Sequence, residues 1–340
     1  MADHLFLAST PFNVLTAAMV AFELPAGDRA RLGLIDQTDA TEAFRQALIH
    51  WHSSPFSTIE LLTRKAGGRG KRRQRLAGFA RIRETLAEFP PDQIYTGNDR
   101  RLEFQYAMAH SRARGIYLDD GTYSYLGRPL HWLQDRVIDN LVKKLAYGWW
   151  WRQPPAIGAS SWIDHCIVAF PDSVIPALRQ KHCHPLPANL QRPEFRELAR
   201  LCLGDQPVDL STLDGLLLLP HSSVLSENQP VLGRWLDQCG ADIAYKHHPR
   251  TDTTLQTAGR ARDLWHLPDR ARPVPAAVPM EILLPLLPQN CKICGDVSTA
   301  LLTAKWLRPE LNVTAVVRKD TTMEWKALLT VLGIQLNESA

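Results

Sequence analysis

The sequence lacks the segments that would carry it into or across a membrane. No apolar run reaches the roughly 18 residues that a transmembrane helix needs. No basic region followed by a long apolar core comes after Met1, so we expect no signal peptide and a cytoplasmic protein. Its thiols should then be reduced. The six cysteines are Cys166, Cys183, Cys202, Cys239, Cys291 and Cys294.

The sequence also lacks the signatures of several other classes. A net charge of +4 suits an anionic ligand or membrane surface but is too weak to indicate nucleic acid. Cys291 and Cys294 have CxxC spacing without a second pair at zinc-finger distance, which argues against a metal site. Ser222 and Ser223 lack the Gly-x-Ser-x-Gly elbow of serine hydrolases. No internal repeat has a fixed period.

Strand and helix patterns alternate along both halves of the chain. A buried strand at residues 4–8 precedes an apolar helix at 14–22, and the alternation continues to a strand at 116–118. A second series opens with a buried strand at 213–219. This order predicts two α/β domains with mostly parallel sheets. We expect a first domain over residues 1–155, a connector and the end of that domain over 156–207, and a second domain over 208–340.

Two adjacent carboxylates end a strand in the first half. Residues 116–122 read IYLDDGT, so a β-prone triplet runs into Asp119 and Asp120 and then a glycine. Ligands of open α/β sheets sit at this carboxyl edge. Neighbouring carboxylates repel, so one can gain the raised pKa that a general base needs. A plain β-turn is the alternative, because Asp-Gly is a common turn pair.

Other polar groups follow predicted strands in both halves. Thr10 and Asn13 follow the first strand, and Asn98 follows the strand at 93–96, so we place all three at the functional edge. In the second half, a strand delivers residues 245–250, YKHHPR, as an anion-facing cluster. Residues 295–299, GDVST, form a strand-to-helix junction with two hydroxyls, which is a phosphate site on physical grounds. Alternatively, its two hydroxyl residues only cap the helix.

Two segments have compositions suited to a membrane surface. Residues 64–75, RKAGGRGKRRQR, are either a solvated loop or a docking site for anionic lipid or an acidic glycan. No aromatic residue interleaves with them, which argues against nucleic acid. An amphipathic helix is predicted from about residue 130 to 153, ending in YGWWWR at 147–152. These tryptophans could meet a membrane, or pack against the other domain or a second subunit.

Two α/β halves of about 150 residues are the architecture of GT-B nucleotide-sugar transferases. The order of the polar segments resembles the bacterial sialyltransferases, most nearly the lipooligosaccharide sialyltransferase and capsule polysialyltransferase families. The resemblance rests on the Asp-Asp-Gly at 119–121, the Lys-His-His-Pro at 246–249 and the Ser-Thr pair at 298–299. Residues 9–13, STPFN, and 279–281, PME, also look like members of that group.

The resemblance implies a role for each matching residue. Asp120 matches the general base that takes the proton from the acceptor hydroxyl, with Asp119 supporting it or contacting the acceptor. His248, which directly precedes Pro249, matches the histidine that acts on the departing CMP phosphate. Ser298 and Thr299 match the hydroxyl pair that holds this phosphate.

Further residues complete the expected site. Glu281 would bind the cytidine ribose, Lys246 would support phosphate neutralisation, and Gly295 and Ser222 would help to bind CMP. The acceptor side would include Thr10, Asn13 and Asn98. The enzyme would use CMP-sialic acid as its donor and would invert the configuration at the anomeric carbon of the sugar. It would need no metal or other cofactor.

Other donors and other classes stay open. Transferases of CMP-Kdo or another CMP-nonulosonic acid have a closely similar set of residues. A non-catalytic glycan- or lipid-binding protein of the same fold is a second alternative. A metal-dependent GT-A transferase is disfavoured, because Asp119 and Asp120 are adjacent and lack Asp-x-Asp spacing. The expected partners are a CMP-sugar and a cell-surface glycan, such as lipooligosaccharide or capsule. Contact with a membrane through residues 64–75 and 147–152, and formation of a homodimer, are further options.

Overall fold

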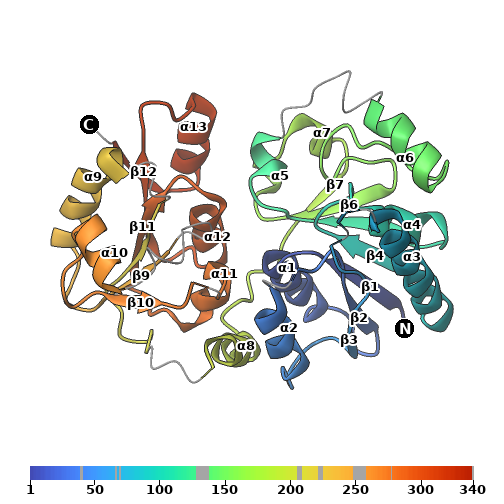
Figure 1. Ribbon diagram of the computed structural model, residues 1–340, viewed down its shortest axis with the longest axis horizontal. Helices are drawn as coiled ribbons and strands as arrows, with labels where there is room; N and C mark the ends of the chain where they lie inside the picture. The colour runs from blue at the N-terminus through green and yellow to red at the C-terminus, as the bar shows by residue number, and fades with distance from the viewer. Residues whose placement is uncertain are drawn as a thin grey trace. The chain divides into compact units, whose positions relative to one another are not determined.

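The computed structural model describes residues 1–38, 41–65, 67–68, 70–127, 138–204, 209–220, 225–247, 258–276 and 278–338. The chain divides into two compact units, Met1–Ala188 and Asn189–Ala340. Each unit has its own parallel sheet and its own core (Figure 1). The predicted pair of α/β domains is therefore confirmed.

The first unit is a doubly wound sheet of seven parallel strands in the order β3-β2-β1-β4-β5-β6-β7. Helices α1 and α2 lie on one face of it, and α3 and α4 lie on the other (Figure 1). The strands are β1 (Asp3–Ala8), β2 (Arg29–Leu34), β3 (Thr58–Leu61), β4 (Gln93–Thr96), β5 (Arg114–Leu118), β6 (Ile163–Val168) and β7 (His182–Pro185). The helices are α1 (Pro11–Ala21), α2 (Glu42–Ile49), α3 (Lys71–Glu88), α4 (Leu102–Ala109), α5 (Tyr123–Leu126), α6 (Asp139–Tyr147) and α7 (Pro176–Arg179), with the 3-10 turn η3 (Pro171–Ser173).

The second unit repeats this strand order with six parallel strands, β10-β9-β8-β11-β12-β13. The strands are β8 (Gly215–Leu218), β9 (Ile243–Lys246), β10 (Arg272–Val274), β11 (Lys292–Asp296), β12 (Asn312–Val317) and β13 (Gln335–Glu338). The helices are α8 (Pro193–Leu203), α9 (Leu225–Asp237), α10 (Ala258–Trp265), α11 (Met280–Leu283), α12 (Thr299–Leu307) and α13 (Met323–Val331), with the 3-10 turn η6 (Leu284–Leu286).

The central strands are buried on both faces, which explains their apolar sequences. Five of the six residues of β1 are buried, and five of the six of β12. A strand covered by helices on both sides loses the alternation of polar and apolar residues that marks a half-exposed strand. Strand order reverses beside β1 in the first sheet and beside β8 in the second. Such switch points leave room for a ligand at the carboxyl ends of the strands.

The boundary between the units lies within the segment that the sequence assigned to a connector and the end of the first domain. Residues 156–188 contribute β6 and β7 to the first sheet, and residues 193–203 form α8 of the second unit. The short strands β7, β10 and β13 were not predicted. They are edge strands of three or four residues, and two of them contain a proline, Pro185 or Pro273.

The aromatic segment differs from its prediction. Helix α6 covers only part of the expected 130–153, and residues 128–137 lie outside the described part of the chain. Trp151 is buried within the first unit beneath the Lys143 ammonium, which lies 4.2 Å from the ring centroid. Trp150 contacts Phe79 edge-on, with ring centroids 5.7 Å apart. Trp149 is 75% exposed. The three tryptophans therefore have three different environments.

Candidate functional site

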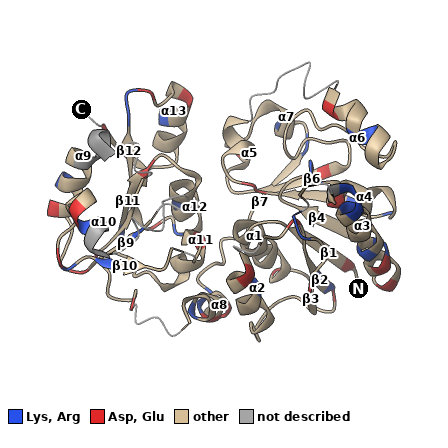
Figure 2. Cartoon of the chain, viewed as in Figure 1, with Lys and Arg blue, Asp and Glu red and all other residues tan. Residues whose placement is uncertain are grey.

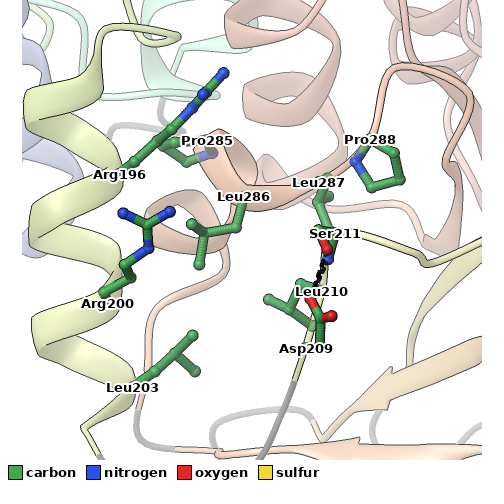
Figure 3. A pocket seen from close by; sticks show the side chains of 10 residues that line it. All are labelled: Arg196, Arg200, Leu203, Asp209, Leu210, Ser211, Pro285, Leu286, Leu287 and Pro288. Atoms are coloured by element: carbon green, nitrogen blue, oxygen red, sulfur yellow. Dashed lines mark hydrogen bonds between the residues drawn. The ribbon is translucent and has the colours of Figure 1, made fainter.

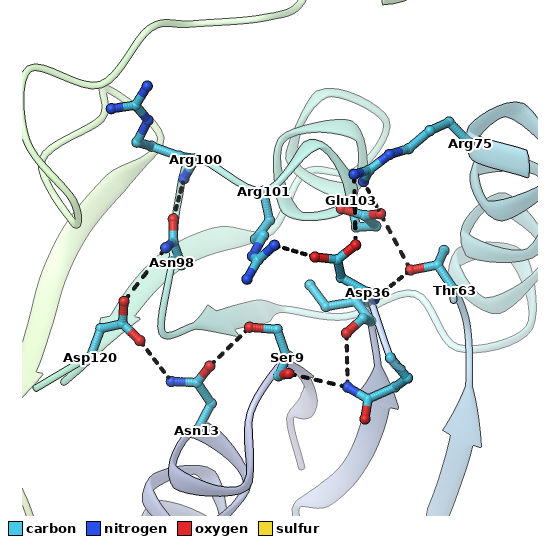
Figure 4. A network of polar contacts seen from close by, with 12 residues as sticks. Ser9, Asn13, Asp36, Thr63, Arg75, Asn98, Arg100, Arg101, Glu103 and Asp120 are labelled. Atoms are coloured by element: carbon cyan, nitrogen blue, oxygen red, sulfur yellow. Dashed lines mark hydrogen bonds and ion pairs between the residues drawn. The ribbon is translucent and has the colours of Figure 1, made fainter. Parts of the chain in front are cut away.

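Three predicted residues meet where β1, β4 and β5 of the first unit end (Figure 4). The Asn13 amide donates to Asp120 Oδ1 at 3.1 Å, and the Asn98 amide lies 3.5 Å from Asp120 Oδ2. Ser9 Oγ donates to Asn13 Oδ1 at 3.1 Å, which fixes the orientation of that amide. Thr10 is the N-cap of α1 and accepts from the backbone N–H of Asn13 at 3.1 Å. The loop after β1 therefore aims one amide at one carboxylate.

The Asp120 carboxyl has an electrostatic environment suited to a base. Burial raises its pKa to about 7, because removal from water disfavours the charged form. The Asn13 hydrogen bond and the Arg101 charge oppose this shift, while the Asp119 and Asp99 charges add to it. A carboxyl poised near neutrality exchanges a proton readily at the pH of the cell.

Asp119 differs from its neighbour because every part of its carboxylate is engaged inside the fold. Oδ1 accepts from the Gly121 N–H at 2.9 Å and from Ser124 Oγ at 2.8 Å. Oδ2 accepts from the Ala169 N–H at 2.9 Å and from the Tyr125 hydroxyl. With 1% of its surface exposed, Asp119 ties β5 to α5 and to the end of β6. Its carboxylate therefore fixes the loop that carries Asp120.

A third carboxylate, Asp99, went unnoticed in the sequence. It is fully buried and accepts from the backbone N–H groups of Gly158 at 2.8 Å and Ser160 at 2.7 Å. Burial raises its pKa. Gly158 has φ +82°, and a Cβ there would lie 2.8 Å from the Tyr117 ring, so only glycine fits. Asp99 therefore ties the loop before β6 to the loop after β4, which also carries Asn98.

Next to this group lies a network of two arginines and two carboxylates that was also missed (Figure 4). Arg101 donates to Asp36 Oδ2, and Arg75 lies 3.7 Å from Asp36 Oδ1. Arg75 also donates to the buried Glu103 at 2.5 Å. Asp36 has φ +53°, a left-handed conformation that is rare for residues other than glycine. The end of β2 is thus bent to present a carboxylate to two cations.

In the second unit, the end of β9 carries a buried cation. Lys246 is 5% exposed, and its ammonium donates to the Pro275 and Ala276 carbonyls at 3.2 and 2.9 Å. Burial lowers its pKa to about 8, and the charge of Glu281 opposes this shift. Burial likewise raises the pKa of Glu281, in the first turn of α11. Lys246 thus holds the segment before α11 and brings two predicted site residues into electrostatic contact.

The residue after Lys246, His247, packs against β9. His247 is 5% exposed and its ring meets Tyr245 edge-on, with centroids 5.5 Å apart. Its Nε2 has no hydrogen-bond partner in the described part of the chain. Burial, together with the Lys246 charge, lowers its pKa. His248 lies outside the described residues, as does Ser222.

The predicted phosphate-binding segment lies at the carboxyl end of β11. Ser298 is the N-cap residue of α12, but its hydroxyl makes no capping hydrogen bond to the described chain. Thr299 is the first residue of the helix. Gly295 lies inside β11, where a Cβ would meet Leu218 Cβ at 2.8 Å, so it lets two strands approach closely. The hydroxyl residues lie at the strand edge, while Gly295 serves sheet packing.

Comparison with known proteins identifies the fold. No protein-family model and no curated protein sequence matches the chain. Among solved structures, an α/β-galactoside α-2,3-sialyltransferase from Photobacterium phosphoreum matches with a TM-score of 0.58 at 10% identity, over 98% of both chains. The GT-B domain of a Photobacterium damselae sialyltransferase matches with a TM-score of 0.54 at 12% identity, over 100% of both chains. A UDP-N-acetylglucosamine 2-epimerase matches with a TM-score of 0.55 at 12% identity, over 100% of this chain and 84% of that one.

The chain has a GT-B fold. This confirms the predicted fold class, two Rossmann-like domains. Because transferases and an epimerase share the fold at similar scores, the fold alone does not decide between their activities. The residues at the strand ends must supply that argument.

One hollow of this GT-B chain lies away from these residues. It has a volume of about 380 Å³ and is lined by α8 and by the segments before β8 and β11, including Arg196, Arg200 and Leu286 (Figure 3). It lies at the amino ends of those strands, whereas ligands of open α/β sheets bind at the carboxyl ends. Within the described ranges, no group of three His, Cys, Asp or Glu side chains is arranged to hold a metal ion. Nor is any described helix both long and apolar enough to cross a membrane.

Helix α6 of the first unit exposes an apolar face. None of its residues is buried. The side chains of Leu141, Val142 and Leu145 are 50%, 56% and 70% exposed. The ammonium of Lys144 lies 5.8 Å from the centroid of the exposed Trp149 ring. Apolar and basic side chains therefore share this surface.

Proposed function

We propose that this protein is an inverting, metal-independent glycosyltransferase that moves sialic acid from CMP-sialic acid to a hydroxyl group of a cell-surface glycan. The observation that carries the proposal is Asp120, a carboxyl with its pKa raised to about 7. It is held by Asn13 and Asn98, which follow the switch-point strands β1 and β4. The fold is shared with two sialyltransferases of low sequence identity, which supports the class.

The chemistry needs few groups. Asp120 takes the proton of the acceptor hydroxyl as its oxygen attacks the anomeric carbon of the donor sugar. The bond from that carbon to the phosphate oxygen breaks, and CMP departs with the electron pair. Attack opposite to the leaving group converts the β-linked donor into an α-linked product. CMP is a good leaving group, so a base and a stabilised phosphate suffice.

Phosphate stabilisation is assigned to the second unit. The backbone N–H groups at the start of α12, with the hydroxyls of Ser298 and Thr299, would bind this anion. His248 would donate to the departing phosphate, Ser222 would contribute its hydroxyl, and Glu281 would bind the ribose. Lys246 adds positive charge and holds the segment before α11 in place.

The experiment is CMP release from CMP-sialic acid and CMP-Kdo, with EDTA present, for wild type and Asp120→Ala. We expect turnover of the sialic acid donor that EDTA does not reduce and that the variant loses. Asp164→Ala, which changes an exposed carboxylate on β6, is the matched control and should turn over normally. Preferential turnover of CMP-Kdo would replace the donor sugar. CMP binding without turnover of either donor would indicate a different CMP-sugar. Absence of CMP binding would refute the proposal and favour a non-catalytic glycan-binding protein.

A further inference from the structure

A hollow of about 290 Å³ lies beside the Asp120 carboxyl. Its lining residues are Asn98, Arg100, Arg101, Tyr123 and Ile157. Asn98 connects it to the base, because its amide lies 3.5 Å from Asp120 Oδ2. The hollow is near the lower end of the sizes of ligand pockets, about 300 Å³. A molecule that presents a hydroxyl to Asp120 would therefore have neighbouring atoms in this hollow.

The lining of this hollow is cationic. It includes two guanidinium groups and no carboxylate. Arg101 donates through Nη1 to Asp36, and its buried Nε has no partner in the described ranges. A guanidinium has five N–H donors in a planar fork, so Arg101 retains donors for a second anion. The side chain of Arg100 is 12% exposed and lies 3.6 Å from Asp139, which limits its freedom.

The backbone around the arginines is also constrained. The Asn98 side chain accepts from the Arg100 backbone N–H at 3.0 Å. The amide that faces Asp120 therefore also fixes the backbone that carries the two arginines. Asp36 orients Arg101 from a left-handed backbone position, and the Thr63 hydroxyl accepts from its N–H at 2.8 Å. A non-glycine residue in this conformation is strained and persists where the surroundings enforce it. Asp36 is therefore a positioning residue for Arg101.

We propose that this hollow is an acceptor subsite for an anionic group, a carboxylate or phosphate on the acceptor glycan, and that Arg100 and Arg101 determine this specificity. The proposal rests on the proposed function, because it takes the hydroxyl at Asp120 to belong to the acceptor. The exposed Tyr123 ring and the buried Ile157 side chain supply the apolar contact that a sugar ring needs beside its polar groups. A neutral acceptor would offer no anion to the guanidinium donors of Arg101 that Asp36 does not use.

The first test is direct binding, which does not depend on transfer. Ligand-observed NMR titrations would compare N-acetylneuraminic acid with its methyl ester, and galactose 6-phosphate with galactose. A charge-assisted contact to arginine is expected to make each anionic sugar bind about tenfold tighter than its neutral counterpart. Whether the carboxylate or the phosphate gains more identifies the anion. Equal affinities of both anions and their neutral counterparts would overturn the proposal.

The variants separate specificity from folding. Arg100→Gln and Arg101→Gln should each remove most of the tenfold preference, and Arg101→Lys should keep part of it because the charge remains. Arg112→Gln, which changes an exposed arginine before β5, is the matched control and should keep the full preference. Unchanged melting temperatures establish that the variants are folded. A preference that survives both Gln variants would contradict the assignment.

Transfer assays distinguish this subsite from the proposed function. Sialyllactose and its methyl ester would be compared as acceptors at fixed CMP-sialic acid, with CMP release measured also without acceptor. A lower KM for the acid than for the ester, lost in Arg101→Gln, is the expected result. CMP release with equal KM values would refute the subsite alone. Absence of CMP release from every donor would refute the proposed function, and the acceptor subsite with it.

Discussion

Replacing Asp120 with asparagine should stabilise the protein while abolishing transfer. The pKa of this carboxyl is about 7 in the folded chain, against 3.8 without burial. At about 1.36 kcal/mol per pKa unit, holding Asp120 ionised costs the fold up to about 4 kcal/mol. A group with a raised pKa contributes its full stability below about pH 4 and loses it as the pH rises to about 7.

The neutral amide does not bear this cost at any pH. Its oxygen can accept from Asn13 as the carboxylate does. Its NH₂ group would face the NH₂ group of Asn98, and the lost hydrogen bond would cost the fold about 1–2 kcal/mol. The net gain at pH 8 is therefore about 2–3 kcal/mol. For a domain of this size, that corresponds to a melting temperature higher by about 5–10 °C.

The assay is thermal unfolding at pH 5 and pH 8, with CMP release measured on the same samples. The difference between variant and wild type should be larger at pH 8. Asp119→Asn is the control, because its NH₂ group would meet two of the four donors that now bind the carboxylate. It should lower the melting temperature at both pH values. A gain for Asp120→Asn that does not depend on pH would refute the reasoning about its ionisation.

Three further predictions follow from the site and from α6. The transfer rate should rise with pH through about 7, the pKa of the base. Asn13→Ala should move this midpoint up by about one pH unit or more, because a hydrogen bond to the charged form of Asp120 is lost. An unchanged midpoint would contradict a role for Asn13 in setting the pKa of Asp120. Lys246→Met should weaken CMP binding in calorimetry about tenfold or more, whereas Lys292→Met, at the opposite end of its sheet, should not. We propose that the apolar and basic face of α6 meets an anionic membrane surface, so Leu141→Ser with Leu145→Ser should reduce flotation with anionic vesicles; equal flotation would argue against this contact.

The sequence predicted the site best where a residue lies in the loop or the first helical turn after a strand. Asn13, Asn98 and Asp120 were placed at one edge because parallel strands share a carboxyl edge, and the structure brings them within hydrogen-bonding distance. That inference needs only the order of strands and loops. Their catalytic and binding roles remain predictions.

Contacts set by the tertiary fold were not accessible in this way. Asp36 and Arg101 are 65 positions apart, and nothing local marks them as partners. Asp99 has no distinguishing neighbour in the sequence, because its two backbone donors, Gly158 and Ser160, come from a distant loop. In the tryptophan segment the sequence suggested more than the fold bears out. Its composition predicts one shared surface for the three rings. Gly148, at φ +138°, instead precedes a turn that gives each ring a different neighbour.

The all-parallel sheets have a consequence for how the chain folds. No two neighbouring strands can form a hairpin, so each pairing must close a long loop, and His4 of β1 pairs with Gln93 of β4 across 89 positions (93 − 4). Such non-local topologies fold slowly. The first sheet is complete at β7, before any strand of the second has been synthesised. During synthesis the unit that holds Asp120 can therefore fold before the second unit is made. Substitutions that destabilise this first unit should cause nascent chains to aggregate early, before the second unit is synthesised.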